Sequence, residues 1–450
     1  MRQVPAVNRR LSWLHQSTLA TSSRLTISSR CDLGDYGGTV SSAETVPDVS
    51  LSDIEAARRL LEGVALTTPV EESRWLTKAV GAPVVLKCEN LQRAGSFKIR
   101  GAYVRIARLT DAERARGVVA ASAGNHAQGV ALAASLLGTH STVFMPEGAP
   151  IPKESATRAY GADVQFAGPN VETALVAAQE FADRTGAVLI HPFDHPDIVA
   201  GQATLGLELL EQVPDLATVV VSVGGGGLAA GTATAIHAIR PDVRVIGVQA
   251  ERAAAYPVSL REGSPVTVPC QPTIADGIAI ARPGAVPFAA ITRHLDGVVT
   301  VSEDSLSRAL LSMLERAKLL VEPAGAAAVA GLLEHRESIV DGRGTVVAVL
   351  TGGNIDPLLL MQVIRHGMAS AGRYLSLRVK IPDRPGGLVH LLTELAQLQV
   401  NVLDVVHERT SASLHVDEVE VSLQLETRGA SHAARVTAHL QDKKYAYRML

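Results

Sequence analysis

Two hydrophobic patterns alternate along the middle of the chain. From about residue 83, short apolar runs of strand length, such as VVAAS and STVFMP, are followed by stretches with apolar residues at helical spacing, such as NHAQGVALAASLLG. The succession continues as far as the apolar run TVVAVLTG. Strands that alternate with helices predict parallel sheets joined by right-handed crossover helices, and ligands of such folds bind beyond the carboxyl ends of the strands.

The end of the chain has a different pattern. Strict alternation of apolar and polar positions, typical of half-buried strands, occurs in LSLRVKIPD and HVDEVEVSLQLETRG. Helical spacing returns in GGLVHLLTELAQLQV and SHAARVTAHLQDKKY, and a further strand is indicated by NVLDVVHERT. The predicted order is strand, helix, strand, strand, helix. We therefore expect a small α+β domain at residues 374–450, after the linker HGMASAGRY.

Residues 1–48 follow neither pattern. Five arginines and many serines and threonines occur near the start, and no acidic residue precedes Asp32. This composition is typical of an organellar transit peptide, and a disordered extension or a start codon assigned too far upstream is the alternative. We expect ordered structure from about Val49, in a helix capped by Ser52, and an α/β region over residues 49–370. A smaller subdomain within it is expected at about residues 83–150.

The composition narrows the class of protein. The 450 residues are 47% hydrophobic and 3% aromatic, which suits two or three domains with aliphatic cores. A net charge of -3 argues against nucleic acid as a partner, and no apolar run reaches the length of a membrane-spanning helix. The cysteines, Cys31, Cys88 and Cys270, are odd in number and far apart. They predict neither a disulfide framework nor a zinc site, which favours a reducing, cytoplasmic location.

A glycine run, Gly224–Gly227, separates a predicted strand from a predicted helix in SVGGGGLAAG. Backbone N–H groups can converge there on an anion at the helix N-terminus, and a phosphate is the natural ligand. A dinucleotide is the alternative, because Gly224, Gly226 and Ala229 match a dinucleotide fingerprint and Glu251 follows the next strand. A turn without a ligand is disfavoured, since four glycines cost backbone entropy.

Neutral hydrogen-bonding groups gather in a second strand-to-helix loop, ASAGNHAQG, which contains Ser122, Asn125, His126 and Gln128. With the helix N-terminus they suit a carboxylate, because backbone amides and a hydroxyl can bind one without an arginine. The alternatives are helix capping by Ser122 or Asn125 and a structural role for His126. A third loop, LTGGN, places Thr351 at the end of another strand.

A lysine stands in the segment AGSFKIRGA, between an aromatic residue and a small apolar run. Taken alone, Lys98 is either a surface residue at the start of a helix or a lysine that bonds covalently to a carbonyl cofactor. The three loops favour the second interpretation. A reactive lysine, a phosphate site, a carboxylate site and a hydroxyl are the groups that pyridoxal phosphate needs when it acts on an amino acid.

Five segments, in order along the chain, closely resemble the threonine/serine dehydratases: GSFKIRGA, SAGNHAQG, GGGGL, EPAGA and TGGN. These enzymes, also called ammonia-lyases, are pyridoxal-phosphate enzymes of fold type II, the tryptophan-synthase-β-like fold. The resemblance covers roughly residues 50–370. The tail from Leu375, with its IPDRPGGL turn, resembles an ACT regulatory domain. The implied architecture is an α/β catalytic region of two parallel-sheet subdomains, followed by a small α+β ACT-like domain.

The resemblance implies pyridoxal 5′-phosphate as cofactor and L-threonine as substrate. The enzyme would remove the α-proton, eliminate the β-hydroxyl as water, and release 2-oxobutanoate and ammonia, with side activity on L-serine. The family also implies a homodimer or homotetramer. An amino-acid effector, isoleucine or valine, would bind the ACT-like domain near Asp383–Leu388, as suits isoleucine biosynthesis. A domain used only for oligomer contacts is the alternative.

The resemblance also implies a role for each motif residue. Lys98 would hold the cofactor covalently and then act as the base that removes the α-proton. Asn125 would hydrogen-bond the 3′-oxygen of the cofactor ring, and Thr351 would meet the pyridine nitrogen. The implied cofactor-binding residues are Phe97, Lys98, Asn125, Gly224, Gly225, Gly226, Gly227, Leu228, Glu322 and Thr351. The implied binding residues for the substrate carboxylate are Ser122, Ala123, Gly124, Asn125 and His126.

Other functions stay open at this point. Serine dehydratases and serine racemases resemble the chain, but racemases carry a second serine, an acid/base group, where this sequence has Ala123. Dehydration is therefore favoured over racemisation. A non-catalytic amino-acid sensor is disfavoured because every chemical residue is present. A nicotinamide-dependent oxidoreductase is the remaining alternative, resting on the glycine fingerprint alone.

Overall fold

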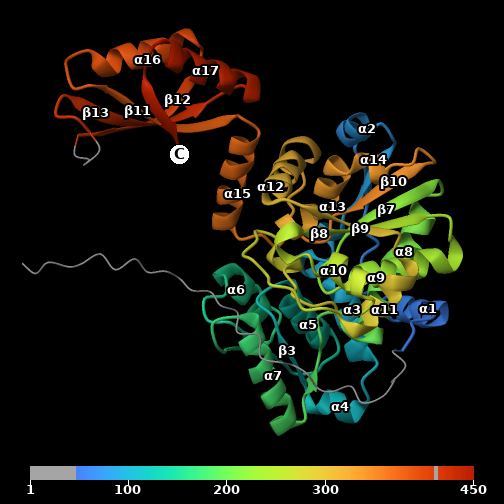
Figure 1. Ribbon diagram of the computed structural model, residues 1–450. Helices are drawn as coiled ribbons and strands as arrows, with labels where there is room; N and C mark the ends of the chain where they lie inside the picture. The colour runs from blue at the N-terminus through green and yellow to red at the C-terminus, as the bar shows by residue number, and fades with distance from the viewer. Residues whose placement is uncertain (1–46, 410–413) are drawn as a thin grey trace, which may run out of the picture. The chain divides into compact units, whose positions relative to one another are not determined.

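The computed structural model describes residues 47–409 and 414–450. The predicted N-terminal extension, apart from its last two residues, lies outside the described residues, and so does Cys31. The described helices include none whose length and apolar character would allow it to cross a membrane. Figure 1 shows the arrangement of the helices and strands.

The larger sheet has six strands. Each neighbouring pair is parallel except the antiparallel pair of β1 and β2 at one edge. This arrangement confirms the predicted α/β class. In spatial order the strands are β1 (Val70–Glu72), β2 (Val84–Lys87), β10 (Thr345–Val349), β7 (Leu216–Ser222), β8 (Arg244–Ala250) and β9 (Gly297–Val301).

Two aliphatic cores lie on the two faces of the larger sheet. Along β7, Val219 and Val221 belong to one core and Val220 to the other, because successive side chains of a strand point to opposite faces. Burial on both faces explains why the strands read as continuous apolar runs. The helices on the first face are α1 (Leu51–Leu60), α8 (Pro196–Gln212), α9 (Gly227–Ile239), α10 (Ala255–Glu262) and α11 (Ala285–His294). Those on the second face are α2 (Arg74–Val80), α12 (Glu303–Ser312), α13 (Pro323–Glu334), α14 (Arg336–Ile339) and α15 (Pro357–Ser370).

The smaller sheet has four parallel strands, in the order β5 (Asp163–Phe166), β4 (Ser141–Met145), β3 (Val118–Ala121) and β6 (Val188–Leu189). Its helices are α3 (Lys98–Ala107), α4 (Asp111–Arg116), α5 (Asn125–Leu136), α6 (Ile151–Ala159) and α7 (Val171–Thr185), which Figure 1 shows around β3. The expected subdomain at residues 83–150 therefore differs from the structure. The strand Val84–Lys87 pairs with β10 of the larger sheet, a partner far along the chain that local sequence does not reveal.

The first helix begins two residues before the position expected from Ser52. Its N-cap is Ser50, whose hydroxyl accepts a hydrogen bond from Asp53 N at 3.3 Å. The Asp53 carboxylate accepts from Ser50 N at 3.0 Å, so that the two residues form a capping box. In a capping box the acidic residue stands three positions after the N-cap. Asp53 is that residue here, so Ser50 is the N-cap and Ser52 lies inside the first turn.

Residues 374–409 and 414–450 form an antiparallel sheet with two helices. The spatial order is β12 (Asn401–Glu408), β13 (Glu418–Glu426), β11 (Tyr374–Pro382) and β14 (Ala446–Met449), and the helices are α16 (Gly387–Gln397) and α17 (Ala430–Asp442). The edge strand β14 was not predicted, because four residues carry too little alternation to indicate a strand. The predicted elements before it are present. Alternate residues of β11, such as Leu377 and Val379, are buried, as the alternating pattern predicted.

Short segments complete the α/β region. They are the 3₁₀ helices η1 (Glu89–Leu91), η2 (Arg93–Gly95), η3 (Glu251–Ala253) and η4 (Asp276–Ile278), and a π-helical turn, η5 (Met313–Ala317). Of these, η2 leads directly into the segment that carries Lys98. The segment η4 lies beside the cavity described next.

Candidate active site

A cavity of about 520 Å³ lies at the carboxyl ends of β3, β7 and β10, where ligands of α/β folds bind. Strands of both parallel sheets thus contribute loops to it. Gln128 of the second loop does not line the cavity, whereas the residues that the family resemblance implied for cofactor and substrate binding all do: Phe97, Lys98, Ser122, Ala123, Gly124, Asn125, His126, Gly224, Gly225, Gly226, Gly227, Leu228, Glu322 and Thr351. The fold therefore brings together segments that are up to about 250 residues apart in the chain.

Lys98 is the first residue of α3 and points its amine into the cavity. Its Nζ donates a hydrogen bond to the carbonyl oxygen of Pro192 at 3.0 Å and lies 5.2 Å from the centroid of the Phe97 ring. Burial lowers the pKa of Lys98 to about 8, although the nearby carboxylate of Glu322 opposes the shift. The amine is therefore neutral far more often near pH 8 than an exposed lysine would be.

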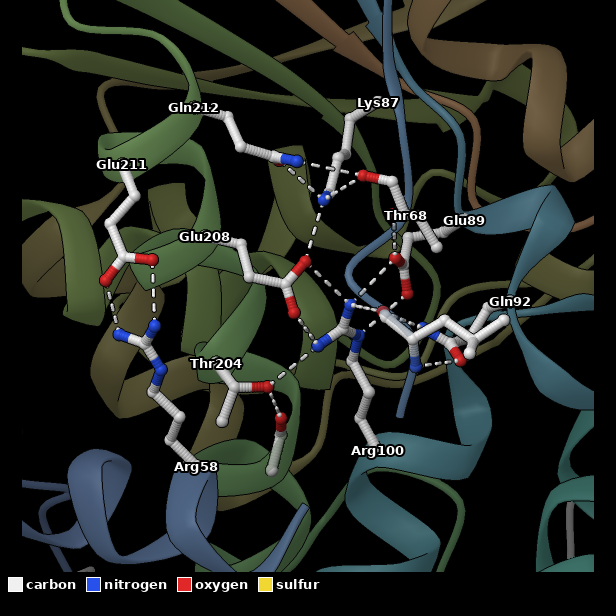
Figure 2. Close-up of polar contacts among 12 residues, drawn as sticks. Arg58, Thr68, Lys87, Glu89, Gln92, Arg100, Thr204, Glu208, Glu211 and Gln212 are labelled. Atoms are coloured by element: carbon white, nitrogen blue, oxygen red, sulfur yellow. Dashed lines mark hydrogen bonds and ion pairs between the residues drawn. The ribbon is translucent and has the colours of Figure 1, made fainter. Parts of the chain in front are cut away.

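The helix that carries Lys98 is held by Arg100, whose guanidinium is buried two residues further on. The guanidinium donates to both carboxylate oxygens of Glu89, at 2.8 and 2.9 Å, and to both of Glu208, at 2.6 and 3.0 Å. Lys87 on β2 donates to Glu208 at 2.7 Å. Figure 2 shows the four charges as one connected network, and their side chains are at most 11% exposed. This arrangement fixes α3 against β2 and α8.

The same helix touches α8 at a pair of glycines. A Cβ atom on Gly201 of α8 would lie 2.6 Å from the Cα atom of Gly101 and 2.7 Å from the carbonyl oxygen of Arg100. A Cβ atom on Gly101 would lie 2.9 Å from the carbonyl oxygen of Ile198. The two helix backbones are thus in direct contact, which only glycine permits at these positions. Together with the charge network, this contact sets the place of Lys98.

The glycine run, Gly224–Gly227, lines the cavity without any side chain. Gly226 has φ +101 and caps α9, and a Cβ atom there would overlap the hydroxyl of Tyr256. A Cβ atom on Gly225 would overlap the ring of Phe193. The N-terminus of α9, which carries partial positive charge, begins at the next residue. The loop therefore fits an anion such as phosphate. Glu251, which a dinucleotide site would use, is exposed and does not belong to the cavity lining that the described residues define.

The loop between β3 and α5 carries the groups predicted for a carboxylate. Its Ser122 hydroxyl accepts a hydrogen bond from Gly124 N at 3.1 Å, and α5 begins at Asn125. His126 donates from Nε2 to the carbonyl oxygen of Ile190 at 2.8 Å. Burial lowers the pKa of His126 to about 3, so the imidazole is neutral at physiological pH. This hydrogen bond is the structural role that the sequence left open, although the residue also lines the cavity.

Asn125 and Glu322 connect the two halves of the cavity. The amide of Asn125 donates to the carboxylate of Glu322 at 2.5 Å, and Asn354 donates to the Asn125 side-chain oxygen at 2.8 Å. Burial, joined by the negative charge of Asp276, raises the pKa of Glu322 to about 7. Glu322 can therefore hold or release a proton close to neutral pH.

Thr351 places a hydroxyl at the end of β10, as the sequence predicted. Its Oγ1 lies 3.1 Å from the hydroxyl of Ser222 and donates to the carbonyl oxygen of Ala324 at 3.4 Å. The carbonyl oxygen of Thr351 accepts a hydrogen bond from Phe97 N at 3.2 Å, which ties this loop to the lysine segment. The two hydroxyls form a small polar group at the carboxyl ends of β7 and β10.

Sequence reasoning missed several residues of the lining. Ser222 could have been found, because it ends the strand that precedes the glycine run, with only Val223 between them. Phe193, Lys153 and Asp276 lie in segments without a recognised motif, and only the folded chain brings them to the cavity. Further lining residues that the sequence did not indicate include Pro192, Gln202 and Ile278, and also Ala324, which lies within the EPAGA segment.

Comparison with protein families gives one match that spans most of the α/β region. The family of pyridoxal-phosphate dependent enzymes matches residues 61–352. An L-threonine ammonia-lyase of Geobacter sulfurreducens is 46% identical over 391 residues, which are 87% of this chain and 96% of the relative. An L-threonine ammonia-lyase of Thermotoga maritima is 43% identical over 89% of this chain and its own full length.

Solved structures agree on the fold. The processed threonine deaminase isoform 2 of Solanum lycopersicum superposes with a TM-score of 0.68 at 36% identity, covering 71% of this chain and 95% of that one. The serine racemase of maize superposes with a TM-score of 0.67 at 34% identity, covering 70% and 97%. Proteins named for different reactions thus share this architecture. The fold alone does not determine the reaction, which depends on the groups that line the cavity.

Proposed function

The chain belongs to the pyridoxal-phosphate dependent enzymes of fold type II, and on that premise we propose that it is an L-threonine ammonia-lyase. The proposed reaction converts L-threonine to 2-oxobutanoate and ammonia. The names of the similar enzymes from Geobacter and Thermotoga support this substrate. The single structural observation that carries the proposal is that Lys98, the glycine run and the Ser122–His126 loop line one cavity.

The cavity fits the phosphate of the cofactor. The glycine run keeps its backbone free of side chains at the N-terminus of α9, where N–H groups are available to an anion. We propose that this run, Gly224–Gly227, holds the phosphate together with Leu228. Lys98 supplies a buried amine for the cofactor carbonyl, and Phe97 lies beside that amine.

The cavity also offers partners for the rest of the cofactor. Asn125 and Glu322 are hydrogen-bonded to each other and are proposed to lie beside the ring, with Asn125 at its 3′-oxygen. Thr351 is proposed to meet the ring nitrogen. A hydroxyl in that position carries no charge, so it would not force a proton onto the nitrogen as a carboxylate would.

When bound, pyridoxal phosphate supplies a carbonyl carbon for amines and a ring that delocalises the negative charge left by loss of an α-proton. The protein supplies the base. The amine of Lys98, with its pKa of about 8, is available in its neutral form to take the α-proton at Nζ. The Ser122–His126 loop orients the substrate through its carboxylate, using backbone amides and the Ser122 hydroxyl.

Serine activity is the second candidate. Solved structures named serine racemase are 34% identical to this chain, so a similar cavity can accept serine in those proteins. A racemase must also return a proton to the opposite face of the α-carbon. Ala123 has no group that can do so, and the neutral His126 beside it, with a pKa of about 3, is not a proton donor. We therefore propose elimination, with L-serine as a slower substrate.

The test is direct. Purified protein loaded with pyridoxal phosphate is mixed with L-threonine or L-serine, and 2-oxo acid and ammonia are measured. We expect turnover of L-threonine and a loss of about 10³-fold or more in the Lys98→Ala variant. Binding of amino acids without release of product would favour the sensor instead.

We further propose that residues 374–450 are an ACT-like regulatory domain, beside a catalytic domain at residues 49–370. The antiparallel sheet and its two helices support this assignment. The effector is proposed to be isoleucine or valine, bound near Asp383–Leu388 in a homodimer or homotetramer, and the enzyme is proposed to act in the cytoplasm. Addition of L-isoleucine should then change the threonine dependence of turnover, and an unchanged curve in its presence contradicts the regulatory assignment.

A further inference from the structure

An ion pair crosses the cavity at a place that no sequence motif indicated. Lys153 lies in the first turn of α6, beside the smaller sheet, and Asp276 begins η4, next to α13 of the larger sheet. The Nζ of Lys153 donates to Oδ2 of Asp276 at 2.8 Å. Both residues belong to the cavity lining.

The two partners differ in their surroundings. The side chain of Lys153 is 9% exposed, whereas that of Asp276 is 53% exposed. Burial alone would lower the pKa of Lys153, but the charge and hydrogen bond of Asp276 outweigh burial and raise it. The ammonium is therefore charged at neutral pH. In the described part of the chain it makes one hydrogen bond, to Asp276, although an ammonium carries three donors.

The ammonium lies beside the loop proposed to bind the substrate carboxylate. A Cβ atom added to Gly124 would be 3.8 Å from Nζ of Lys153, which is ordinary van der Waals contact. Gly124 is the middle of the Ser122–His126 loop, and α5 begins directly after it. A buried cation with unused donors next to this loop is placed to meet an incoming anion.

We infer that Lys153 binds the carboxylate of the amino-acid substrate directly, and that Asp276 holds its ammonium in the cavity while no substrate is present. The inference rests on the proposed function, because it takes an amino acid as the ligand. The carboxylate would use the donors of Lys153 that Asp276 leaves free, and would strengthen the neutral contacts of the Ser122–His126 loop with a full positive charge.

A purely structural ion pair makes a different prediction. If the pair only joined α6 to η4, then loss of either partner would do equal harm. If Lys153 binds the substrate, Asp276 competes with the substrate for the same ammonium. Loss of Asp276 should then leave the affinity for substrate unchanged or improve it, whereas loss of Lys153 should weaken it.

The experiment measures steady-state turnover of L-threonine by the wild type, Lys153→Met, Lys153→Arg, Asp276→Asn and a control, Lys78→Met. Lys78 is an exposed lysine on α2, outside the cavity lining. We expect KM to rise about tenfold or more in Lys153→Met, with a much smaller change in kcat, because a charged hydrogen bond to the substrate is lost. Lys153→Arg should restore most of the affinity, and Asp276→Asn should have a KM equal to or below that of the wild type.

A second measurement separates binding from folding. L-Alanine has no leaving group at its β-carbon and should inhibit competitively, and L-alaninamide is its analogue without the carboxylate. Lys153→Met should raise the inhibition constant of L-alanine about tenfold or more while leaving that of L-alaninamide within about twofold. A variant that is merely misfolded would lose both alike.

The outcomes are distinct. A wild type that releases no 2-oxobutanoate from L-threonine overturns the proposed function and this inference with it. An active wild type whose KM does not respond to Lys153→Met, or responds equally to Asp276→Asn, overturns the inference alone. Equal effects on L-alanine and L-alaninamide overturn it as well.

Discussion

The side-chain amide of Asn125 donates a 2.5 Å hydrogen bond to the carboxylate of Glu322. One residue begins α5 beside the smaller sheet, and the other caps α13 beside the larger sheet. Glu322 has a raised pKa of about 7 and its charge in turn acts on Lys98 across the cavity. The interaction between the charges of Glu322 and Lys98 makes the protonation states of these two groups depend on each other.

The reactivity of Lys98 toward the cofactor should follow its lowered pKa. Only the neutral amine attacks a carbonyl, so cofactor-free protein should capture pyridoxal phosphate about tenfold faster per pH unit up to about pH 8, and at a constant rate above it. Glu322→Gln removes a charge that raises this pKa, so its midpoint should lie at lower pH. Stopped-flow absorbance measures the rate, with the exposed Glu62→Gln as control. A midpoint near 10, the value for an ordinary lysine, would contradict the assignment.

Gly226→Ala should weaken cofactor binding. The substitution strains a backbone with φ +101 and overlaps the hydroxyl of Tyr256, so the loop that is proposed to hold the phosphate has to move. We expect a loss of about 10- to 100-fold in affinity for pyridoxal phosphate, measured by fluorescence titration of cofactor-free protein. Gly63→Ala is the matched control, because Gly63 also has a positive φ, +73, but has open space around it. Equal affinities in the two variants would show that the overlap does not matter.

Arg100→Met should destabilise the fold strongly. The change leaves the carboxylate of Glu89 without its buried ion-pair partner and leaves Glu208 with Lys87 alone, and an uncompensated buried charge costs about 3–5 kcal/mol. Figure 2 also contains the matched control, the pair of Arg58 and Glu211, whose side chains are 45% and 57% exposed. Arg58→Met should cost about 0–1 kcal/mol. Urea unfolding measures both free energies, and similar values for the two variants would refute the role of the buried network.

Ala123→Ser should open a route to racemisation. The new hydroxyl would stand in the loop that lines the cavity, at a position where the methyl group of Ala123 has no proton to give to the second face of the α-carbon. We expect the rate of D-serine formation from L-serine to rise about 10²-fold, measured by chiral chromatography. Ala121→Ser adds a hydroxyl elsewhere in the same lining and should not raise it. If both variants form D-serine at equal rates, a hydroxyl at position 123 has no particular role in racemisation.

The parts of the site that could be predicted share one property. Lys98, Thr351 and the glycine run each lie where a predicted strand ends or a predicted helix begins, so parallel-sheet topology alone places them at one edge. Lys153 and Asp276 could not be found in this way. Each belongs to a segment of ordinary composition, and their meeting depends on how the two sheets face each other, which no local pattern encodes.

The same limit applies to the fold. The alternating pattern predicted the parallel sheets, but it did not show that Val84–Lys87 belongs to the larger sheet, since the partner of that strand, β10, lies about 260 residues later. The tail was easier to predict, because apolar and polar residues alternate clearly in the sequences of β11 and β13. Its last strand, Ala446–Met449, is short and at an edge, and escaped the prediction for that reason.

The contact of Gly101 with Gly201 also bears on how this enzyme could be redesigned. A side chain on Gly201 would reach within 2.6 Å of the opposite backbone, so neither helix can be enlarged at the crossing without moving Lys98. A change of substrate range has to come from the loops that line the cavity, whose side chains can vary in size. Gly101 and Gly201 should therefore be kept unchanged in any redesign. Variant libraries are better directed at the residues that border the substrate.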